Sequence, residues 1–345
     1  MNIKLLESLC CTFGVSGRED EIAETVKEAI VCDEVVRDRA GNLICVKKST
    51  DKDAPTVILD AHMDSVGLCV KEVLSGGFLK FTAVGGIDPR VLPAAKVLVC
   101  TKGGDKILGV ISTKPPHLMD KKDRAETASI DKMLIDTGGR AETVSVGDRV
   151  QFYPAFRKLI SSVNGTYLDN RAGCAAVIEV FEKLKDEKLP FHLAGVFSVG
   201  EESGLKGASS ADLNADLALV IDATFGRTPF DKSDETFVCG EGVAIGTGPN
   251  VNRAVQKGLE ESAARAGIPY QIEVLEGCSG TNAWSYQVHR LGIPCGMLSF
   301  PLKHMHTPAE VLSVKDFDAT VSTAEAYLRA LTKAEILRIA GDVEC

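Results

Sequence analysis

The chain has 345 residues, of which 45% are hydrophobic and 25% are charged, a composition typical of a globular protein with two domains or one large one. With 39 basic and 48 acidic residues, its formal net charge is −9. A negative surface attracts neither nucleic acids nor anionic membranes, so we expect neither as a partner.

The first predicted elements are a helix followed by short strands. Apolar residues recur at helical spacing after Ser16 or Gly17, so a helix is expected to begin there. Residues 33–47 alternate between apolar and polar and predict two short strands joined by a turn. The apolar run 56–59 predicts a buried strand that leads directly into His62.

The pattern changes between about residues 69 and 162. Pairs of glycine separate short strand candidates there, and long helical periodicity is hard to find. Closely spaced strands with glycine turns are typical of a small β-barrel or sandwich. We therefore expect a β insertion.

Strands and helices alternate again after residue 164. In chain order the pattern predicts a helix at 171–184, strands at 192–199 and 217–222, a helix at 252–266, a strand at 293–300 and a final helix opened by Ser313. Strands that alternate with helices predict an α/β sheet flanked by helices. The expected domains are thus a discontinuous α/β domain at 1–68 and 163–345 and an inserted, barrel-like β domain at 69–162.

Polar residues follow several of these strands. At or just beyond strand ends, or just ahead of a helix, lie His62, Asp64, Asp169, Glu201, Glu202, Asp222 and His306. Because the carboxyl ends of parallel strands meet at one edge of a sheet, these side chains are expected to converge there. Each has an ordinary alternative when taken singly, such as a helix cap for Asp169 or a solvated loop for Glu201 and Glu202.

The number of acidic groups in this set predicts bound cations. A buried carboxylate is strongly disfavoured without a compensating charge, and two divalent ions would balance three carboxylates and a hydroxide. Histidine and carboxylate ligands without a thiolate suit zinc or cobalt, and manganese is also compatible.

The cysteines are not expected to take part in this site. There are eleven, no two of them have the spacing of a zinc knuckle or redox motif, and most lie among apolar residues. Reduced thiols, the lack of a signal peptide pattern and the lack of a long apolar stretch lead us to expect a cytoplasmic location.

Six motifs in order give the sequence a family resemblance. It resembles the TET-type (tetrahedral) dinuclear-metal aminopeptidases, which include deblocking, glutamyl and leucyl aminopeptidases. The resemblance covers essentially the whole chain and is carried by DAHMDSVG (60–67), LDNRAGC (168–174), GEESGLKGA (200–208), VIDATF (220–225), SGTNA (279–283) and KHMHTPAE (303–310).

The resemblance implies a role for each site residue. His62 and Asp222 would bind one metal ion, Glu202 and His306 would bind the other, and Asp169 would bridge the two. Glu201 matches the general base that takes a proton from a metal-bridging water. Asp64 matches the second catalytic position, the carboxylate that orients His62; this agrees with the need of a metal-bound histidine for an acceptor on its other ring nitrogen.

The implied activity is the hydrolysis of N-terminal residues from peptides. An N-acyl-amino-acid deacylase or another dinuclear-metal amidohydrolase is the alternative. Less favoured are an endoglucanase, since one Trp and 6% aromatic residues are few for a sugar-binding cleft, and a non-catalytic assembly protein, since all the expected site residues are present.

The resemblance also implies an assembly, and the sequence departs from the family at two positions. The inserted domain would mediate dimerisation, and six dimers would form a hollow tetrahedral dodecamer, although smaller homo-oligomers stay open. Asn282 replaces a common Asp, and His304 replaces a residue that is often aromatic. Neither is an expected metal ligand, and the side-chain preference at the cleaved end is left open.

Overall fold

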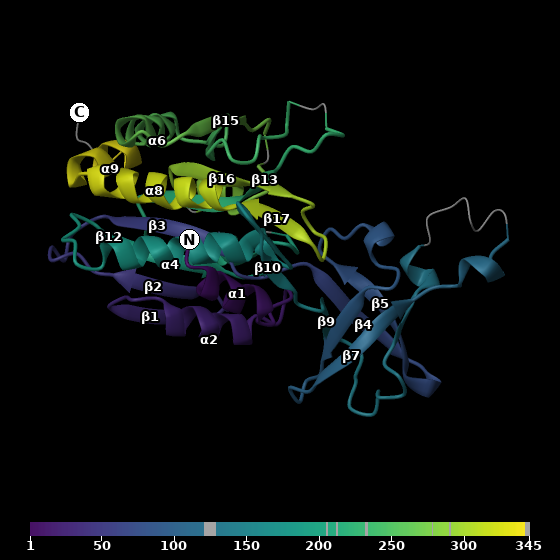
Figure 1. Cartoon of the computed structure of the whole chain (residues 1–345). Coiled ribbons are helices and arrows are strands. Elements are labelled where there is room, and N and C mark those ends of the chain that lie inside the picture. Colours follow the sequence, from purple (N-terminus) through teal and green to yellow (C-terminus); the bar gives the residue numbers. More distant parts are fainter. Residues whose placement is uncertain are drawn as a thin grey trace.

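A mixed sheet of eleven strands forms the larger part of the molecule (Figure 1). The computed structural model describes residues 1–120, 129–204, 206–211, 213–231, 234–277, 279–289 and 291–341. The sheet contains β1 (Glu34–Arg37), β2 (Leu43–Lys47), β12 (His192–Ser198), β3 (Thr56–His62), β13 (Leu217–Phe225), β16 (Cys295–Lys303), β17 (Glu310–Ser313), β11 (Ser162–Gly165) and β10 (Phe156–Lys158), in that spatial order. Strand β14 (Val243–Thr247) pairs with β16 and with β15 (Tyr270–Val274).

The four central strands are parallel and supply the edge that the site needs. Strands β12, β3, β13 and β16 pair in parallel, whereas β1, β2, β17, β11 and β10 pair antiparallel to their neighbours. The four are almost continuously buried, as expected for strands covered on both faces. Their carboxyl ends therefore lie side by side at one edge.

Helices cover both faces of this sheet. One face packs against α1 (Ile3–Cys11), α2 (Asp20–Ala29), α4 (Leu168–Leu184), α6 (Arg253–Ala266), α8 (Val314–Ala330) and α9 (Lys333–Ala340), and the other against the short α5 (Lys206–Ser210) and α7 (Asn282–Gln287). Strand β3 shows the alternation: Val57 and Leu59 belong to the first core, and Ile58 belongs to the second.

A separate, closed six-stranded barrel projects from the sheet (Figure 1). Its strands are β4 (Gly67–Val73), β5 (Phe78–Val84), β8 (Leu134–Asp136), β7 (Lys106–Ser112), β6 (Lys96–Cys100) and β9 (Arg149–Phe152), in spatial order. It has its own hydrophobic core and carries the 3₁₀ turns η1 (Ser75–Gly77), η2 (Pro89–Val91), η3 (Pro116–Leu118) and η4 (Ile130–Lys132). The expected fold, an α/β sheet with an inserted β-barrel, is confirmed.

The details differ from expectation at several boundaries. The helix expected near Ser16 begins at Asp20, and a further helix, α1, precedes it. Helix α4 starts earlier than expected, but the backbones of Asp169 and Asn170 are not helical. The chain rejoins the large sheet at β10, within the range 69–162, and the division into two domains at these boundaries stays a proposal.

The described part of the chain offers no candidate for a bilayer crossing, because none of its helices combines the necessary length with the necessary apolar character.

Candidate metal centre

The edge formed by the parallel strands collects the predicted site residues. His62 is the last residue of β3, and Asp222 lies near the end of β13. Glu201 and Glu202 follow β12, and His306 follows β16. The remaining residue, Asp169, comes from the first turn of α4, which packs against β3 and β13.

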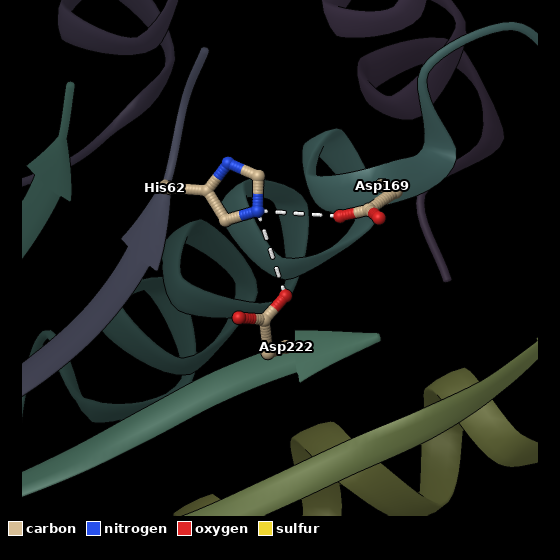
Figure 2. A group of neighbouring side chains, drawn as sticks. All are labelled: His62, Asp169 and Asp222. Carbon is tan, nitrogen blue, oxygen red and sulfur yellow. Dashed lines mark ion pairs between the residues drawn. The ribbon is translucent and has the colours of Figure 1, made fainter. Parts of the chain in front are cut away.

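His62, Asp169 and Asp222 form one compact group (Figure 2). The Nε2 atom of His62 lies 3.2 Å from Oδ1 of Asp169 and 3.5 Å from Oδ1 of Asp222. All three side chains are at most 7% exposed. One ring nitrogen and two carboxylate oxygens thus face a common point, as a metal ligand set requires.

Asp169, Glu202 and His306 form a second group. The Nε2 atom of His306 lies 3.3 Å from Oδ2 of Asp169 and 3.3 Å from Oε2 of Glu202. Asp169 thus belongs to both groups and turns one oxygen toward each histidine. The structure brings the five expected ligands together in the arrangement that the resemblance implies, and their ligation of metal stays a prediction.

The donor atoms fit two divalent cations. In both histidines Nδ1 faces an oxygen: it lies 3.2 Å from the backbone oxygen of Asp64 in His62 and 2.8 Å from that of Gly86 in His306. A hydrogen bond there leaves Nε2 free to bind a metal. In addition, the Oε1 atom of Glu202 is buried and has no hydrogen-bond partner. A buried acceptor of this kind is costly unless a cation or water meets it.

Glu201 stands beside these groups and belongs to neither. Its Oε2 atom lies 3.9 Å from Nε2 of His62, and its side chain is 9% exposed. The chain from Glu201 to Gly204 forms a turn, closed by a 3.0 Å hydrogen bond between their backbones. The backbone is therefore not extended here, although an extended backbone would have been one way to point the side chains of Glu201 and Glu202 in different directions. Glu201 nevertheless reaches toward His62, and Glu202 reaches toward His306.

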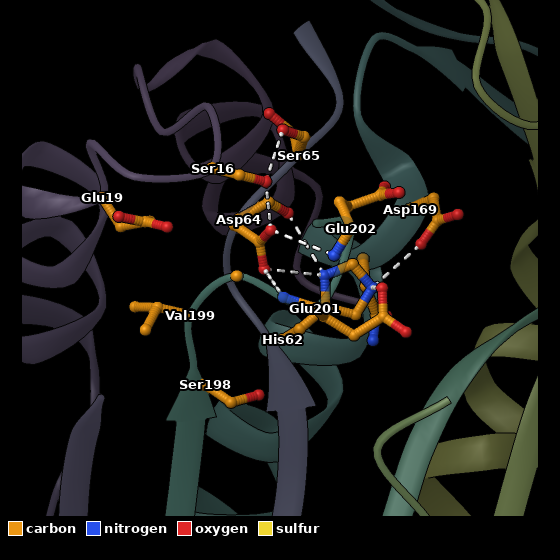
Figure 3. A network of polar contacts seen from close by, with 12 residues as sticks. Ser16, Glu19, His62, Asp64, Ser65, Asp169, Ser198, Val199, Glu201 and Glu202 are labelled. Carbon is orange, nitrogen blue, oxygen red and sulfur yellow. Dashed lines mark hydrogen bonds and ion pairs between the residues drawn. The ribbon is translucent and has the colours of Figure 1, made fainter. Parts of the chain in front are cut away.

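Asp64 holds the elements of the site in place (Figure 3). Its Oδ1 atom accepts a 3.0 Å hydrogen bond from the backbone N–H of Glu201 and lies 3.4 Å from Nδ1 of His62. Its Oδ2 atom accepts from the backbone N–H of Glu202 and from the hydroxyl of Ser16. Asp64 is fully buried. Asp64 therefore fixes the turn that carries both glutamates. The orientation of His62 by its carboxylate stays a prediction, because the backbone oxygen of Asp64 lies closer to Nδ1, at 3.2 Å.

Glu310 has a similar role that the sequence did not reveal. Its carboxylate is buried and accepts two backbone hydrogen bonds, at 3.1 Å from Asp169 and at 2.9 Å from His306. It thus joins the start of α4 to the loop after β16. The sequence offered only its place at the end of the KHMHTPAE motif.

Burial and neighbouring charges shift the pKa values of the carboxylates at this site. Burial raises the pKa of Glu201 to about 8 and that of Glu202 well above its ordinary value, and burial also raises the pKa of Asp222. Burial also opposes the ionisation of Asp169, but hydrogen bonds from His306 and His62 hold its pKa below the usual value. Burial, together with the neighbouring acids, thus opposes the ionisation of Glu201, Glu202 and Asp222, and a bound cation would favour it.

A cavity of about 530 Å³ opens onto the metal centre. Besides the site residues, its walls include Phe225, Glu273, Thr281, Met297 and Met305, none of which the sequence had singled out. Glu273 is unexpected there, because it is a buried carboxylate on a different part of the sheet.

The two departures from the family pattern lie outside the walls of this cavity. The amide of Asn282 donates to Oδ1 of Asp60 at 2.7 Å and to the hydroxyl of Ser198 at 2.6 Å. His304 borders a neighbouring hollow, which also contacts Phe225. Asn282 can donate to the buried Asp60, whereas an ionised Asp at position 282 would oppose it.

Comparisons with known proteins agree with this geometry. The sequence matches the M42 glutamyl aminopeptidase family over residues 41–322. It is 33% identical to a lysyl aminopeptidase of Pyrococcus furiosus over 343 residues, which cover 95% of this chain and 97% of that protein.

Two solved structures share the fold over nearly the whole chain. A TET aminopeptidase from a marine sediment archaeon of the Thaumarchaeota has a TM-score of 0.91 at 28% identity and covers 97% of this chain and 98% of its own. The TET1 peptidase of Pyrococcus horikoshii, which can assemble into a tetrahedron or a large octahedral shell, has a TM-score of 0.84 at 30% identity, with coverages of 95% and 99%.

Metal binding is expected to release protons and to tighten as the pH rises from 6 to 8. Glu202 and Asp222 have raised pKa values in the metal-free chain. The neighbouring carboxylates likewise outweigh burial and raise the pKa of His62, as Asp169 does for His306. A group with a raised pKa keeps its proton to higher pH and must lose it to bind a metal. Titration calorimetry of the metal-free protein in two buffers of different ionisation enthalpy measures the protons. Equal heats in both buffers would contradict this charge arrangement.

Replacing Glu310 with Gln is expected to weaken metal binding about 10- to 100-fold, the usual effect of losing a group that orients ligands. The amide keeps one acceptor where the carboxylate has two, so the backbone of Asp169 or of His306 loses its partner. Metal content after dialysis against graded chelator measures the effect. Glu276→Gln, which changes an exposed carboxylate outside the centre, is the control. Unchanged affinity in Glu310→Gln would show that the two segments hold their positions without it.

Proposed function

Because the chain belongs to the M42 glutamyl aminopeptidase family, we propose that its cavity binds two divalent metal ions and hydrolyses the first peptide bond of peptide substrates. The observation that carries this proposal is the pair of ligand groups that share Asp169, with Glu201 free beside them. His62 and Asp222 would hold one ion, Glu202 and His306 the other, and Asp169 both.

Held by these five residues, two divalent ions would supply Lewis acidity for the scissile carbonyl and for a water molecule. The proton is transferred by a residue of the chain itself. Glu201 accepts the proton of the attacking water and returns it to the leaving amine. Its position supports this role, because its carboxylate faces His62 from within the cavity wall and is not a member of either ligand group.

The surrounding residues hold Glu201 and the predicted ligands at fixed positions relative to one another. Asp64 fixes the backbone of both glutamates through two hydrogen bonds, and Glu310 fixes the backbone of Asp169 and His306. Neither carboxylate lines the cavity. Asp64 and Glu310 are therefore positioning residues, and their contribution is the fixed geometry that the reaction needs.

The ligand chemistry favours zinc or cobalt, and manganese is compatible with the same donors. Two imidazoles and three carboxylates provide nitrogen and oxygen without sulfur. Activity measured after chelation and return of each ion separately would identify the preferred metal.

A cytoplasmic location is part of the proposal. Nine of the eleven cysteines lie in the described part of the chain, and all nine are free thiols. Free thiols in this number favour a reducing compartment. Cell fractionation would test the location, and recovery in an oxidising compartment would contradict it.

We also propose a homo-oligomer built from dimers, with the barrel insertion as the dimerising domain. A tetrahedral dodecamer agrees with the assembly described for the TET1 peptidase of Pyrococcus horikoshii. Native mass spectrometry is expected to give a mass of twelve chains. A mass of two chains alone would support the dimer and contradict the dodecamer.

The alternative hydrolases differ in the substrate that they require. An N-acyl-amino-acid deacylase would release only the acyl group from an N-acetylated peptide, whereas an aminopeptidase releases amino acids from peptides with a free N-terminus. An endoglucanase needs two carboxylates across a sugar-binding cleft. Here Asp169, Glu202 and Asp222 are gathered around two histidines instead, which favours metal-dependent peptide hydrolysis.

Glu201→Gln is expected to lower kcat by about 10²- to 10⁴-fold, because the amide cannot accept the proton of water. Metal content is expected to stay near that of the wild type, since Glu201 belongs to neither ligand group. Steady-state kinetics with an aminoacyl p-nitroanilide and elemental analysis of the same sample measure both quantities.

Asp169→Ala is the matched contrast, because Asp169 is shared by both groups. This variant is expected to lose both ions together with its activity. A Glu201→Gln enzyme with the wild-type kcat would reject the base assignment, and an Asp169→Ala protein with both ions would reject the shared ligand.

A further inference from the structure

Glu273 occupies a separate position in the cavity, on the same side of the sheet as the metal centre. Asp222 on β13 pairs with Ser299 on β16, and Ser299 pairs in turn with Ala244 on β14. On β14, Gly246 is two residues further along and pairs with Glu273 on β15. Side chains at paired positions, and at every second residue of a strand, share one face. Glu273 therefore lies on the face that carries Asp222.

The lack of a side chain at Gly246 leaves space between Glu273 and β16. A Cβ atom at position 246 would lie 3.0 Å from Cβ of Met297. Met297 and Glu273 both line the cavity, on either side of this glycine. The sheet thus provides a recess that begins at the metal centre and reaches the carboxylate of Glu273.

Glu273 has hydrogen-bond donors but no cation. It is 7% exposed and accepts a 2.6 Å hydrogen bond from the hydroxyl of Ser299. Within the residues that the structure describes, it makes no ion pair with a Lys, an Arg or a His. Burial raises its pKa, and the hydrogen bonds from Ser299 and Thr224 oppose that rise. A buried carboxylate that lines a cavity without a counter-ion is suited to receive one from a ligand.

We propose that Glu273 selects substrates whose N-terminal residue has a cationic side chain, lysine or arginine, by pairing with that charge in the recess beside the metal centre. This proposal rests on the aminopeptidase function above and names its substrate class. The scissile carbonyl would lie at the metal centre, and the first side chain would extend along the sheet toward β15.

The walls of the recess agree with such a side chain. Phe225, Met297 and Met305 provide apolar surface along the cavity, against which the methylene stem of lysine or arginine can pack. The Glu273 side chain extends from β15 back across the sheet, because its carboxylate receives hydrogen bonds from Ser299 on β16 and from Thr224 on β13. The cationic end of a long side chain can meet the carboxylate there, whereas a short side chain leaves it unpaired.

The test compares kcat/KM for the p-nitroanilides of lysine, arginine, leucine and glutamate. The wild type is expected to prefer lysine and arginine and to be slowest with glutamate, which Glu273 would repel. Glu273→Gln is expected to lower the ratio of lysine to leucine about 10- to 100-fold, the range for a hydrogen bond to a charged group. Glu276→Gln, an exposed carboxylate three residues away, is the control and should keep the wild-type ratio.

The leucine substrate separates this proposal from the proposed function. Hydrolysis of leucine with an unchanged lysine-to-leucine ratio in Glu273→Gln would overturn the role of Glu273 and leave the aminopeptidase intact. An equal loss with every substrate would also overturn it, because Glu273 would then serve the common α-amino group or the fold. No hydrolysis of any substrate by the metal-loaded wild type would instead reject the function itself.

A second measurement needs no variant. Free L-lysine and L-norleucine differ at the end of the side chain, where only lysine has an ammonium group. Lysine is expected to inhibit the wild-type enzyme more strongly. Equal inhibition by the two, or stronger inhibition by norleucine, would overturn the proposal.

Discussion

The constraint on which this molecule depends is the burial of four carboxylates beside two histidines at one edge of the sheet. Asp169, Glu201, Glu202 and Asp222 are each at most 9% exposed at the side chain. Two histidines cannot neutralise four acids, and burial, followed by the charges of the neighbouring acids, raises the pKa values of Glu201, Glu202 and Asp222. The fold therefore has to hold the groups together against their repulsion until cations bind. The hydrogen bonds that Asp64 and Glu310 accept from backbone N–H groups do this.

The barrel insertion contributes to the same centre through the loop after β5. The carbonyl oxygen of Gly86 lies 2.8 Å from Nδ1 of His306, and a Cβ atom at Gly85 would lie 3.2 Å from the backbone oxygen of Glu202. Gly85 also has a φ of +79°, which favours glycine. The insertion thus helps to orient His306 in addition to forming a separate core. The position of the insertion relative to the large sheet therefore affects the geometry of the second ligand group.

The sequence predicted the parts of the site that lie next to a strong local pattern. His62 ends β3, and Asp222 ends the strand that was predicted at 217–222, which in the structure continues to Phe225. Because parallel strand ends meet at one edge, the convergence of these two residues follows from the strand predictions. Glu310 was missed because its role depends on hydrogen bonds to residues brought close by folding. The helix predicted at 171–184 agrees with the non-helical backbone of Asp169 and Asn170, whereas helix α1 was missed, and its position depends on tertiary contacts. The buried Arg171, for example, donates hydrogen bonds to the backbone oxygens of Leu9 and Gly14.

Glu273 shows most clearly that the pairing of the strands must be known before the walls of a cavity can be described. It lies 51 residues from Asp222 along the chain, and the two reach one cavity only because β14 pairs with β16 and β15 joins β14. The predicted metal ligands lie in or just beyond the parallel strands and in α4, whereas Glu273 lies on β15 at the margin of the sheet. The contact between Glu273 and the catalytic side of the sheet passes through Ser299 and Thr224, neither of which is in a ligand group. If Glu273 selects the substrate as proposed, changes on β14 or β15 would alter which side chain the cavity accepts while the groups that share Asp169 keep their geometry.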